Sequence, residues 1–209
     1  MLWAIIPVKS LHRSKSRLAG FLSAEDRAAL TRVMLTRLLS VLNAVTQIDG
    51  VLVVSRDAAV HQIAAQFHVD VVAERVGSGL NGAVETGQKC AAAHGAHAVL
   101  ILPSDLPCVQ PKDIEALLGK TAVFPNSIVL CSDRHGQGTN ALLLPVHLPF
   151  QFHYGSQSYQ RHCAEAEKLQ LPHHTVSVPG LQFDLDTRQD WSIYQENLLT
   201  VRDIVDCSC

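Results

Sequence analysis

The sequence predicts an α/β fold, a three-layer sandwich in which helices cover both faces of a mostly parallel β-sheet. Short, nearly unbroken apolar runs alternate with longer segments of helical periodicity, as in buried parallel strands joined by helices. The 209 residues are 47% hydrophobic and 17% charged, which is enough apolar surface for one sizeable core. No repeat or low-complexity linker divides the chain, so we expect a single domain over residues 1–209.

The elements of the first half follow from apolar runs and periodicity. Strands are predicted at 2–8, 50–55, 69–73 and 97–102, each a short apolar run. Helices are predicted at 23–44, 58–67 and 81–94, and Ser23 with Asp26 has the spacing of a helix start. This strict alternation is typical of strands that run parallel.

The pattern changes after Pro111. Strands are predicted at 127–132 and 139–145, separated by the polar, glycine-containing turn 133–138, which indicates a hairpin or a locally antiparallel edge. A helix at 156–169, a strand at 174–178 and a last helix after Thr187 complete the chain. No element is assigned between Pro111 and Ser127.

Composition limits the partners and the location. The formal net charge of -2 gives no general attraction to phosphate backbones, so nucleic acid is not expected as a partner. The first residues are apolar over too short a span to cross a membrane, and they lack the features of a signal peptide. We therefore expect a cytoplasmic protein without a membrane partner, and a homodimer stays open. The six cysteines are scattered along the sequence, which is typical of reduced thiols rather than of a disulfide framework. They are Cys90, Cys108, Cys131, Cys163, Cys207 and Cys209.

An acidic residue stands between two prolines in "LPSDLP", just beyond the predicted strand 97–102. Ligands of doubly wound folds bind outside the carboxyl ends of the strands, where Asp105 would lie. The prolines restrict the backbone there. The alternative is an aspartate that caps a helix or a turn, so the functional interpretation needs a second acidic group.

The segment "FDLDT" supplies two more carboxylates. Asp184 and Asp186 are two residues apart, so in an extended segment they face the same side. Two such carboxylates repel each other unless a cation lies between them. Together with Asp105 they predict a Mg²⁺ site. The alternative for Asp186 is that it caps the helix after Thr187.

The loop after the first strand carries the complementary charge. Five basic residues fall within nine positions, which suits polyphosphate because cations stabilise charge on transferring phosphates. The loop lacks the G-x-x-x-x-G-K-[ST] pattern, and a solvated basic loop is the alternative. The residues are Lys9, His12, Arg13, Lys15 and Arg17.

Six motifs, in order over about residues 3 to 190, resemble the CofC/FbiD guanylyltransferases of coenzyme F420 biosynthesis, within the MobA-like nucleotidyltransferase group. They are "IPVK" with "KSRLA", then "LNGAVETG", "LPSDLP", "GTNALLLP", "YGSQSYQRH" and "FDLDT". The resemblance implies the same sandwich fold. It also implies transfer of GMP from GTP to 3-phospho-D-glycerate, phosphoenolpyruvate or 2-phospho-L-lactate, with release of pyrophosphate.

The resemblance further implies residue roles. The implied residues are Lys9, Lys15 and Arg17 for the GTP phosphates; Leu80, Asn81 and Ala83 for the base or ribose; Thr139, Asn140, Gly155 and Ser158 for the acceptor; and Asp105, Asp184 and Asp186 for Mg²⁺. Because the acceptor phosphate is already ionised, positioning and charge neutralisation suffice as chemistry. We expect Lys15 and Arg17, with Asp105, to be catalytic, and one or two metal ions stay open.

Several alternatives stay open. One is another MobA-like nucleotidyltransferase with a molybdopterin or sugar phosphate acceptor, although its usual glycine-rich loop is missing here. Another is a nucleotide sensor or a Cys/His metal-binding module without enzymatic activity, against which the wide spacing of these residues argues. His162 is either functional or a packed helical histidine. The tail 201–209 matches no family motif, and its C-x-C is too short for a zinc site.

The polar residues near the expected acceptor pocket indicate which phosphoacid the site would select. A site that hydrogen-bonds a substrate hydroxyl discriminates more strongly than shape alone. We therefore favour 3-phospho-D-glycerate or phosphoenolpyruvate over 2-phospho-L-lactate. The polar residues are Thr139, Asn140, Ser156, Ser158 and His162.

Overall fold

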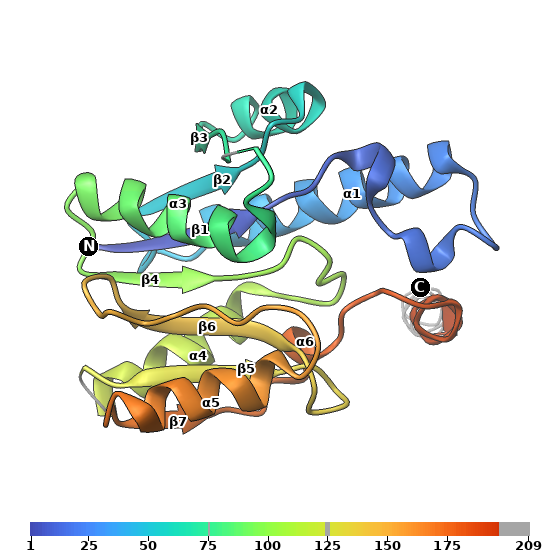
Figure 1. Ribbon diagram of the computed structural model, residues 1–209. Coiled ribbons are helices and arrows are strands. Elements are labelled where there is room, and N and C mark those ends of the chain that lie inside the picture. The colour runs from blue at the N-terminus through green and yellow to red at the C-terminus, as the bar shows by residue number, and fades with distance from the viewer. Residues whose placement is uncertain (75, 124–125, 197–209) are drawn as a thin grey trace, which may run out of the picture.

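A computed structural model describes residues 1–74, 76–123 and 126–196 of the chain (Figure 1). Seven strands form one sheet in the order β3-β2-β1-β4-β6-β5-β7. The strands are β1 (Leu2–Pro7), β2 (Gly50–Val54), β3 (Asp70–Val72), β4 (Ala98–Ile101), β5 (Ile128–Ser132), β6 (Thr139–Pro145) and β7 (His173–Thr175). The α-helices are α1 (Ala24–Asn43), α2 (Ala58–Ala65), α3 (Gly79–Ala93), α4 (Pro111–Val123), α5 (Ser158–Lys168) and α6 (Pro179–Gln182). Residues 188–196 are also helical.

The helices cover both faces of the sheet, as the sequence predicted. One face packs against α1, α2, α4 and α6, and the other packs against α3 and α5 (Figure 1). Alternate residues of β1 point into the two cores: Ala4 and Ile6 belong to one, and Trp3 and Ile5 to the other. This burial on both faces explains the unbroken apolar runs, and the predicted three-layer α/β fold is confirmed.

The strand β6 is the antiparallel member of the sheet. It pairs antiparallel with both β4 and β5, so the predicted hairpin across residues 133–138 is confirmed. The alternative of an antiparallel edge is wrong, because β6 lies inside the sheet and β7 lies at the edge. Residues Thr139 to Leu144 are all buried, as expected for a strand inside the sheet. Because β6 runs antiparallel to β4, its amino end lies at the same end of the sheet as the carboxyl ends of β1 and β4.

Two helices were not predicted. The helix α4 begins at Pro111, where a proline fits the first helical position, and Asp113 lies in its first turn. Ile114 and Leu117 are buried against the core at helical spacing. The four-residue α6 is too short for periodicity to reveal. By contrast, the predicted helix start at Ser23 is confirmed, because its Oγ accepts from the backbone N–H of Asp26 at 3.1 Å.

A small separate cluster fixes the segments that carry the charged residues. Leu18, Met34 and Leu185 are buried together, and Trp191 and Tyr194 pack against them. These residues come from the loop after β1, from α1 and from the segment after α6. The basic loop and the acidic segment are therefore packed against the same helix. No described helix is both long and apolar enough to span a bilayer.

Candidate active site

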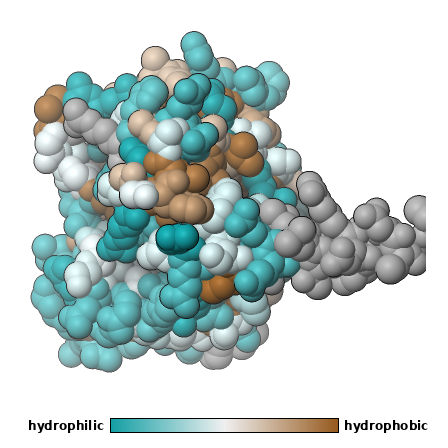
Figure 2. Space-filling view, turned by 90° about the vertical axis from the view of Figure 1, so that its right-hand side faces the viewer, coloured by the Kyte–Doolittle hydropathy of each residue, from teal (hydrophilic) through white to brown (hydrophobic). Residues whose placement is uncertain are grey.

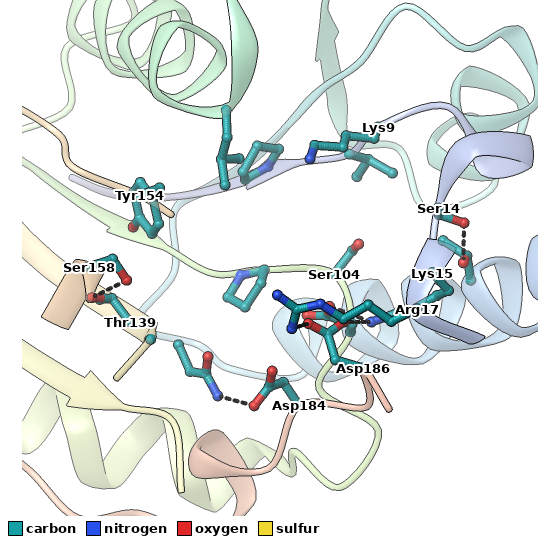
Figure 3. Close-up of a pocket in the computed structure, with 18 of the residues that line it drawn as sticks. Lys9, Ser14, Lys15, Arg17, Ser104, Thr139, Tyr154, Ser158, Asp184 and Asp186 are labelled. Carbon is teal, nitrogen blue, oxygen red and sulfur yellow. Dashed lines mark hydrogen bonds and ion pairs between the residues drawn. The ribbon is translucent and has the colours of Figure 1, made fainter. Parts of the chain in front are cut away.

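A cavity of about 430 Å³ opens where β1 and β4 end and β6 begins (Figure 3). In Figure 3, Lys15, Arg17 and Asp186 lie on one side of it, and Thr139 and Ser158 lie on the opposite side. Figure 2 shows a face of the molecule on which apolar residues gather between more hydrophilic regions. Ten of the predicted site residues line the cavity: Lys9, Lys15, Arg17, Leu80, Asp105, Thr139, Asn140, Ser158, Asp184 and Asp186.

Lys15 joins two of the predicted carboxylates. Its Nζ donates to Asp105 Oδ2 at 2.5 Å and to Asp186 Oδ1 at 2.8 Å, and its side chain is only 4% exposed. Burial acts to lower the pKa of Lys15, but the two carboxylates raise it above its usual value, so the ammonium is charged. The alternative of a solvated loop is wrong for this residue.

Arg17 and Lys9, the other two residues predicted to bind the GTP phosphates, are exposed to solvent. The guanidinium of Arg17 lies 3.5 Å from Asp186 Oδ2, with 73% of its side chain exposed. Lys9 is exposed at the end of β1 and lines the cavity. These two side chains can therefore bind an incoming anion without breaking a buried ion pair.

Of the three predicted metal-binding carboxylates, those of Asp105 and Asp184 have fewer partners in the described structure than that of Asp186. Burial raises the pKa of Asp184 to about 6, and the charge of Asp105 acts in the same direction, against a hydrogen bond from Asn140 to Asp184 Oδ1 at 3.2 Å. Asp105 Oδ1 is buried and has no hydrogen-bond partner among the described residues. These are oxygen atoms that a cation would satisfy. Within the described ranges, however, no three His, Cys, Asp or Glu side chains are grouped so as to hold a metal ion.

The capping alternative for Asp186 is wrong. Asp190 Oδ2 accepts from the backbone N–H of Thr187 at 2.6 Å, and Thr187 Oγ1 accepts from the N–H of Asp190 at 3.3 Å. This reciprocal pair starts the helix at 188–196. The Asp186 carboxylate is thereby left for Lys15 and Arg17. The Asp105 carboxylate likewise bonds Lys15 and no helix terminus that the structure describes.

On the side of the cavity that was predicted to bind the acceptor, the hydroxyl groups lie together. Ser158, at the start of α5, donates from Oγ to Thr139 Oγ1 at 3.2 Å (Figure 3). Both residues are buried in the cavity wall. Gly155 lies in the preceding loop with φ of 127° and is not among the lining residues. Its predicted role stays a prediction.

Asn81 contacts a loop and lines no described cavity. Its Oδ1 accepts from the backbone N–H of Tyr154 at 2.7 Å, and its Nδ2 donates to the carbonyl of Tyr154 at 3.3 Å. In this structure the side chain thus ties the loop before α5 to α3. A contact of Asn81 with the base or ribose stays a prediction.

A second hollow of about 240 Å³ adjoins the first. The two share Pro7, Val8, Lys9 and Leu80, and the second is also lined by the predicted residue Ala83. It contains two charged residues that the sequence reasoning missed: Arg56 and Glu74. Both follow apolar runs at the ends of β2 and β3. The rule that singled out Asp105, a charged residue just past a parallel strand, would have found them.

Comparisons with known proteins agree with this architecture. A 4-diphosphocytidyl-2C-methyl-D-erythritol synthase from Anaerococcus prevotii superimposes with a TM-score of 0.66 over 95% of this chain and 96% of its own, at 12% identity. A nucleotidyl transferase from Methanothermobacter thermautotroptrophicus gives a TM-score of 0.68 over 96% and 99% of the two chains, at 16% identity. At such identities the likeness concerns the fold.

Sequence relatives are more specific. A phosphoenolpyruvate guanylyltransferase from Conexibacter woesei is 35% identical over 200 residues, which cover 96% of this chain and 90% of the relative. A protein of the same name from Rubrobacter xylanophilus is 38% identical over 190 residues, with 90% of each chain covered. These matches support an enzyme over a nucleotide sensor or a metal-binding module. Residues 2–194 match the family described as "Guanylyl transferase CofC like", and the chain belongs to this family of nucleotidyltransferases.

Proposed function

We propose that the protein transfers GMP from GTP to the phosphate of phosphoenolpyruvate, or of a closely related phosphorylated three-carbon acid, in coenzyme F420 biosynthesis. The observation that carries this proposal is the division of the cavity. Carboxylates and cations meet on one side of it, and hydroxyl groups lie on the other. Such a site can hold a polyphosphate next to a small anion, as the reaction requires.

GTP fits the side of the cavity formed by the first half of the chain. Arg17 and Lys9 would bind its phosphates, because both are exposed in the wall of the cavity. The base would enter the second hollow, which adjoins the first and shares Val8 and Leu80 with it as lining residues. In this pose the α-phosphate lies near the carboxylates, and pyrophosphate lies next to Arg17.

In this structure Asp105, Asp184 and Asp186 are not grouped so as to hold a metal ion, and we propose that they come together on Mg²⁺. The partnerless Oδ1 of Asp105 and the raised pKa of Asp184 fit a site that is completed by a cation. When bound, Mg²⁺ would neutralise charge on the α-phosphate and the attacking oxygen. The Lys15 ammonium bridges Asp105 and Asp186 in this structure.

The chemistry needs no strong base. A phosphate oxygen of the acceptor forms a bond to the α-phosphorus of GTP, and the bond from that phosphorus to the bridging oxygen of the β-phosphate breaks. Pyrophosphate leaves with the electron pair, and its charge is stabilised by Arg17 and Lys15. The remaining task of the protein is to align the two anions, which on their own repel each other.

The acceptor side favours phosphoenolpyruvate. The sequence argument for a hydroxylated acceptor counted Thr139, Ser158 and His162 as available polar groups, but Ser158 and His162 each bond Thr139. Fewer groups are therefore left to recognise the hydroxyl of 3-phospho-D-glycerate. The names of the relatives point in the same direction.

The test is a side-by-side assay of pyrophosphate release from GTP with Mg²⁺ and each of the three phosphoacids. We expect kcat/KM to be highest with phosphoenolpyruvate, at least about tenfold above that with 3-phospho-D-glycerate, whose hydroxyl the site would leave unpaired. Release with none of the three would contradict the proposed function. Highest activity with 2-phospho-L-lactate would contradict the choice of acceptor.

Glu74 is expected to select guanine in the second hollow. A carboxylate can accept from both N1–H and the 2-amino group of guanine, whereas adenine offers no donor at either position. Glu74→Gln should therefore reduce the preference for GTP over ATP, measured as a ratio of kcat/KM values, by about tenfold or more. Glu25→Gln, in the exposed first turn of α1, is the control. An unchanged ratio in Glu74→Gln would mean that other groups read the base.

A further inference from the structure

His162 is a fully buried histidine of α5 with both ring nitrogens hydrogen bonded. Its Nε2 lies 2.9 Å from the backbone nitrogen of His153, and its Nδ1 lies 2.9 Å from Thr139 Oγ1. The rings of Phe150 and Tyr154 pack against it, at centroid distances of 5.7 and 4.8 Å. The side chain is thus held in one orientation behind the acceptor side of the cavity.

The two partners decide which ring nitrogen carries the proton. A backbone N–H can only donate, so Nε2 of His162 accepts from His153 and carries no proton. Burial lowers the pKa of His162 to about 3, and the charges of His153 and Arg161 act in the same direction, so the ring is neutral at physiological pH. Its single proton is therefore on Nδ1 and is donated to Thr139 Oγ1.

Thr139 Oγ1 consequently accepts two hydrogen bonds. One comes from His162 at 2.9 Å and the other from the Ser158 hydroxyl at 3.2 Å. A hydroxyl oxygen has two lone pairs and one proton, so both lone pairs are used and the proton points elsewhere. In the described part of the chain no third group receives that proton, and Thr139 lines the cavity.

We propose that His162 is a positioning residue that directs the hydroxyl proton of Thr139 toward an oxyanion of the acceptor, its phosphate or its carboxylate. This inference rests on the proposed function. Without the donor at Nδ1, the Thr139 hydroxyl can turn its proton away from the cavity, and the ligand then loses a hydrogen bond to a charged oxygen. The effect is confined to the acceptor, because Thr139 lies across the cavity from Lys15 and Arg17 (Figure 3).

Two substitutions separate the ring hydrogen bonds of His162. His162→Gln places an amide oxygen near the position of Nε2, so it still accepts from His153, but it has no donor near Thr139. His162→Asn places an amide nitrogen near the position of Nδ1 and still donates to Thr139. We expect His162→Gln to raise the KM for phosphoenolpyruvate by about tenfold with little change in the KM for GTP, and His162→Asn to rescue that KM even where its Tm falls.

A merely structural histidine would give a different pattern. His94→Gln is the control, because His94 also hydrogen-bonds the backbone, through the carbonyl of Cys90, and packs on an aromatic ring, Trp3, but it is exposed and follows the far end of α3. Thr139→Val removes the hydroxyl, and adding His162→Gln to it should raise the acceptor KM no further. Additive effects, equal effects of the Gln and Asn variants, or an equal rise in the KM for GTP would overturn the proposal.

A binding measurement keeps this test apart from the proposed function. If the wild-type protein released no pyrophosphate with any phosphoacid, the proposed function would fail. Calorimetric titration with inorganic phosphate would then decide the role of His162: weaker binding to His162→Gln than to the wild type supports it, and equal binding overturns it. Nitrogen NMR of labelled histidine checks the tautomer directly, and a His162 ring protonated on Nε2 would also overturn the proposal.

Discussion

Asp105→Asn should lower kcat/KM for pyrophosphate release by about a hundredfold to a thousandfold while the protein stays folded. The amide keeps the shape of the side chain but cannot neutralise a cation, and Oδ1 of Asp105 is a buried oxygen without another partner in the described structure. Asp184→Asn should act in the same direction for the same reason. The measurement is steady-state kinetics with GTP, phosphoenolpyruvate and Mg²⁺, with circular dichroism as the check on folding.

A suitable control for Asp105→Asn is Asp49→Asn. The Asp49 carboxylate also accepts a strong hydrogen bond, from the backbone N–H of Leu2 at 2.6 Å, but it lies at the amino ends of β1 and β2, away from the cavity at their carboxyl ends. It should leave kcat/KM within about twofold of the wild type, as expected for a substitution away from the site. Near wild-type turnover by Asp105→Asn would show that this carboxylate has no role in holding the metal.

Lys15→Met should destabilise the protein and abolish most of its activity. The substitution leaves Asp105 and Asp186 without the ammonium that joins them. Removing one partner from a fully buried ion pair costs about 3 kcal/mol, and the 22% and 37% exposure of the two carboxylates reduces this cost. For a chain of this length, we expect Tm to fall by up to roughly 6 °C. Mg²⁺ at millimolar concentration should restore part of this loss, because it replaces the missing positive charge.

The metal response is the sharper part of this prediction. We expect Mg²⁺ to raise the Tm of Lys15→Met more than that of the wild type, because Lys15 no longer competes for the same carboxylates. Thermal unfolding with and without Mg²⁺ measures both effects, and Lys9→Met, which removes an exposed cation, is the control for charge alone. An equal response of Lys15→Met and the wild type would mean that Lys15 and the metal do not share these carboxylates.

Local patterns in the sequence account for most of the fold. Buried parallel strands need apolar side chains on both faces, so β1, β2 and β4 were visible as short apolar runs. The place of β6 was not visible, because its position between β4 and β5 depends on pairing with residues distant in the chain. The helix α4 was not predicted although its local signals were present, because a proline such as Pro111 marks the end of one element as well as the start of a helix.

The site, like the fold, could be predicted where it depends on local patterns and could not where it depends on tertiary contacts. The acidic and basic residues were found because ligands of such folds bind near the carboxyl ends of the strands, and charges of opposite sign were predicted to gather there. Their partners depend on tertiary contacts: Lys15 meets Asp105 and Asp186 at separations of 90 and 171 residues. The bond from Tyr154 to Asn81 likewise spans 73 residues. No local pattern reports contacts of that kind.

The interior position of β6 has a consequence for how such enzymes diverge. The ladder between β4 and β6 is where the strands before Pro111 meet those after it. The loop with Lys15 and Arg17 lies before this boundary, whereas Thr139 and Ser158 lie after it. With the roles proposed above for these residues, acceptor choice can change through substitutions within one continuous stretch of the gene, or through recombination at the turn before α4, while the loop with Lys15 and Arg17 is inherited intact.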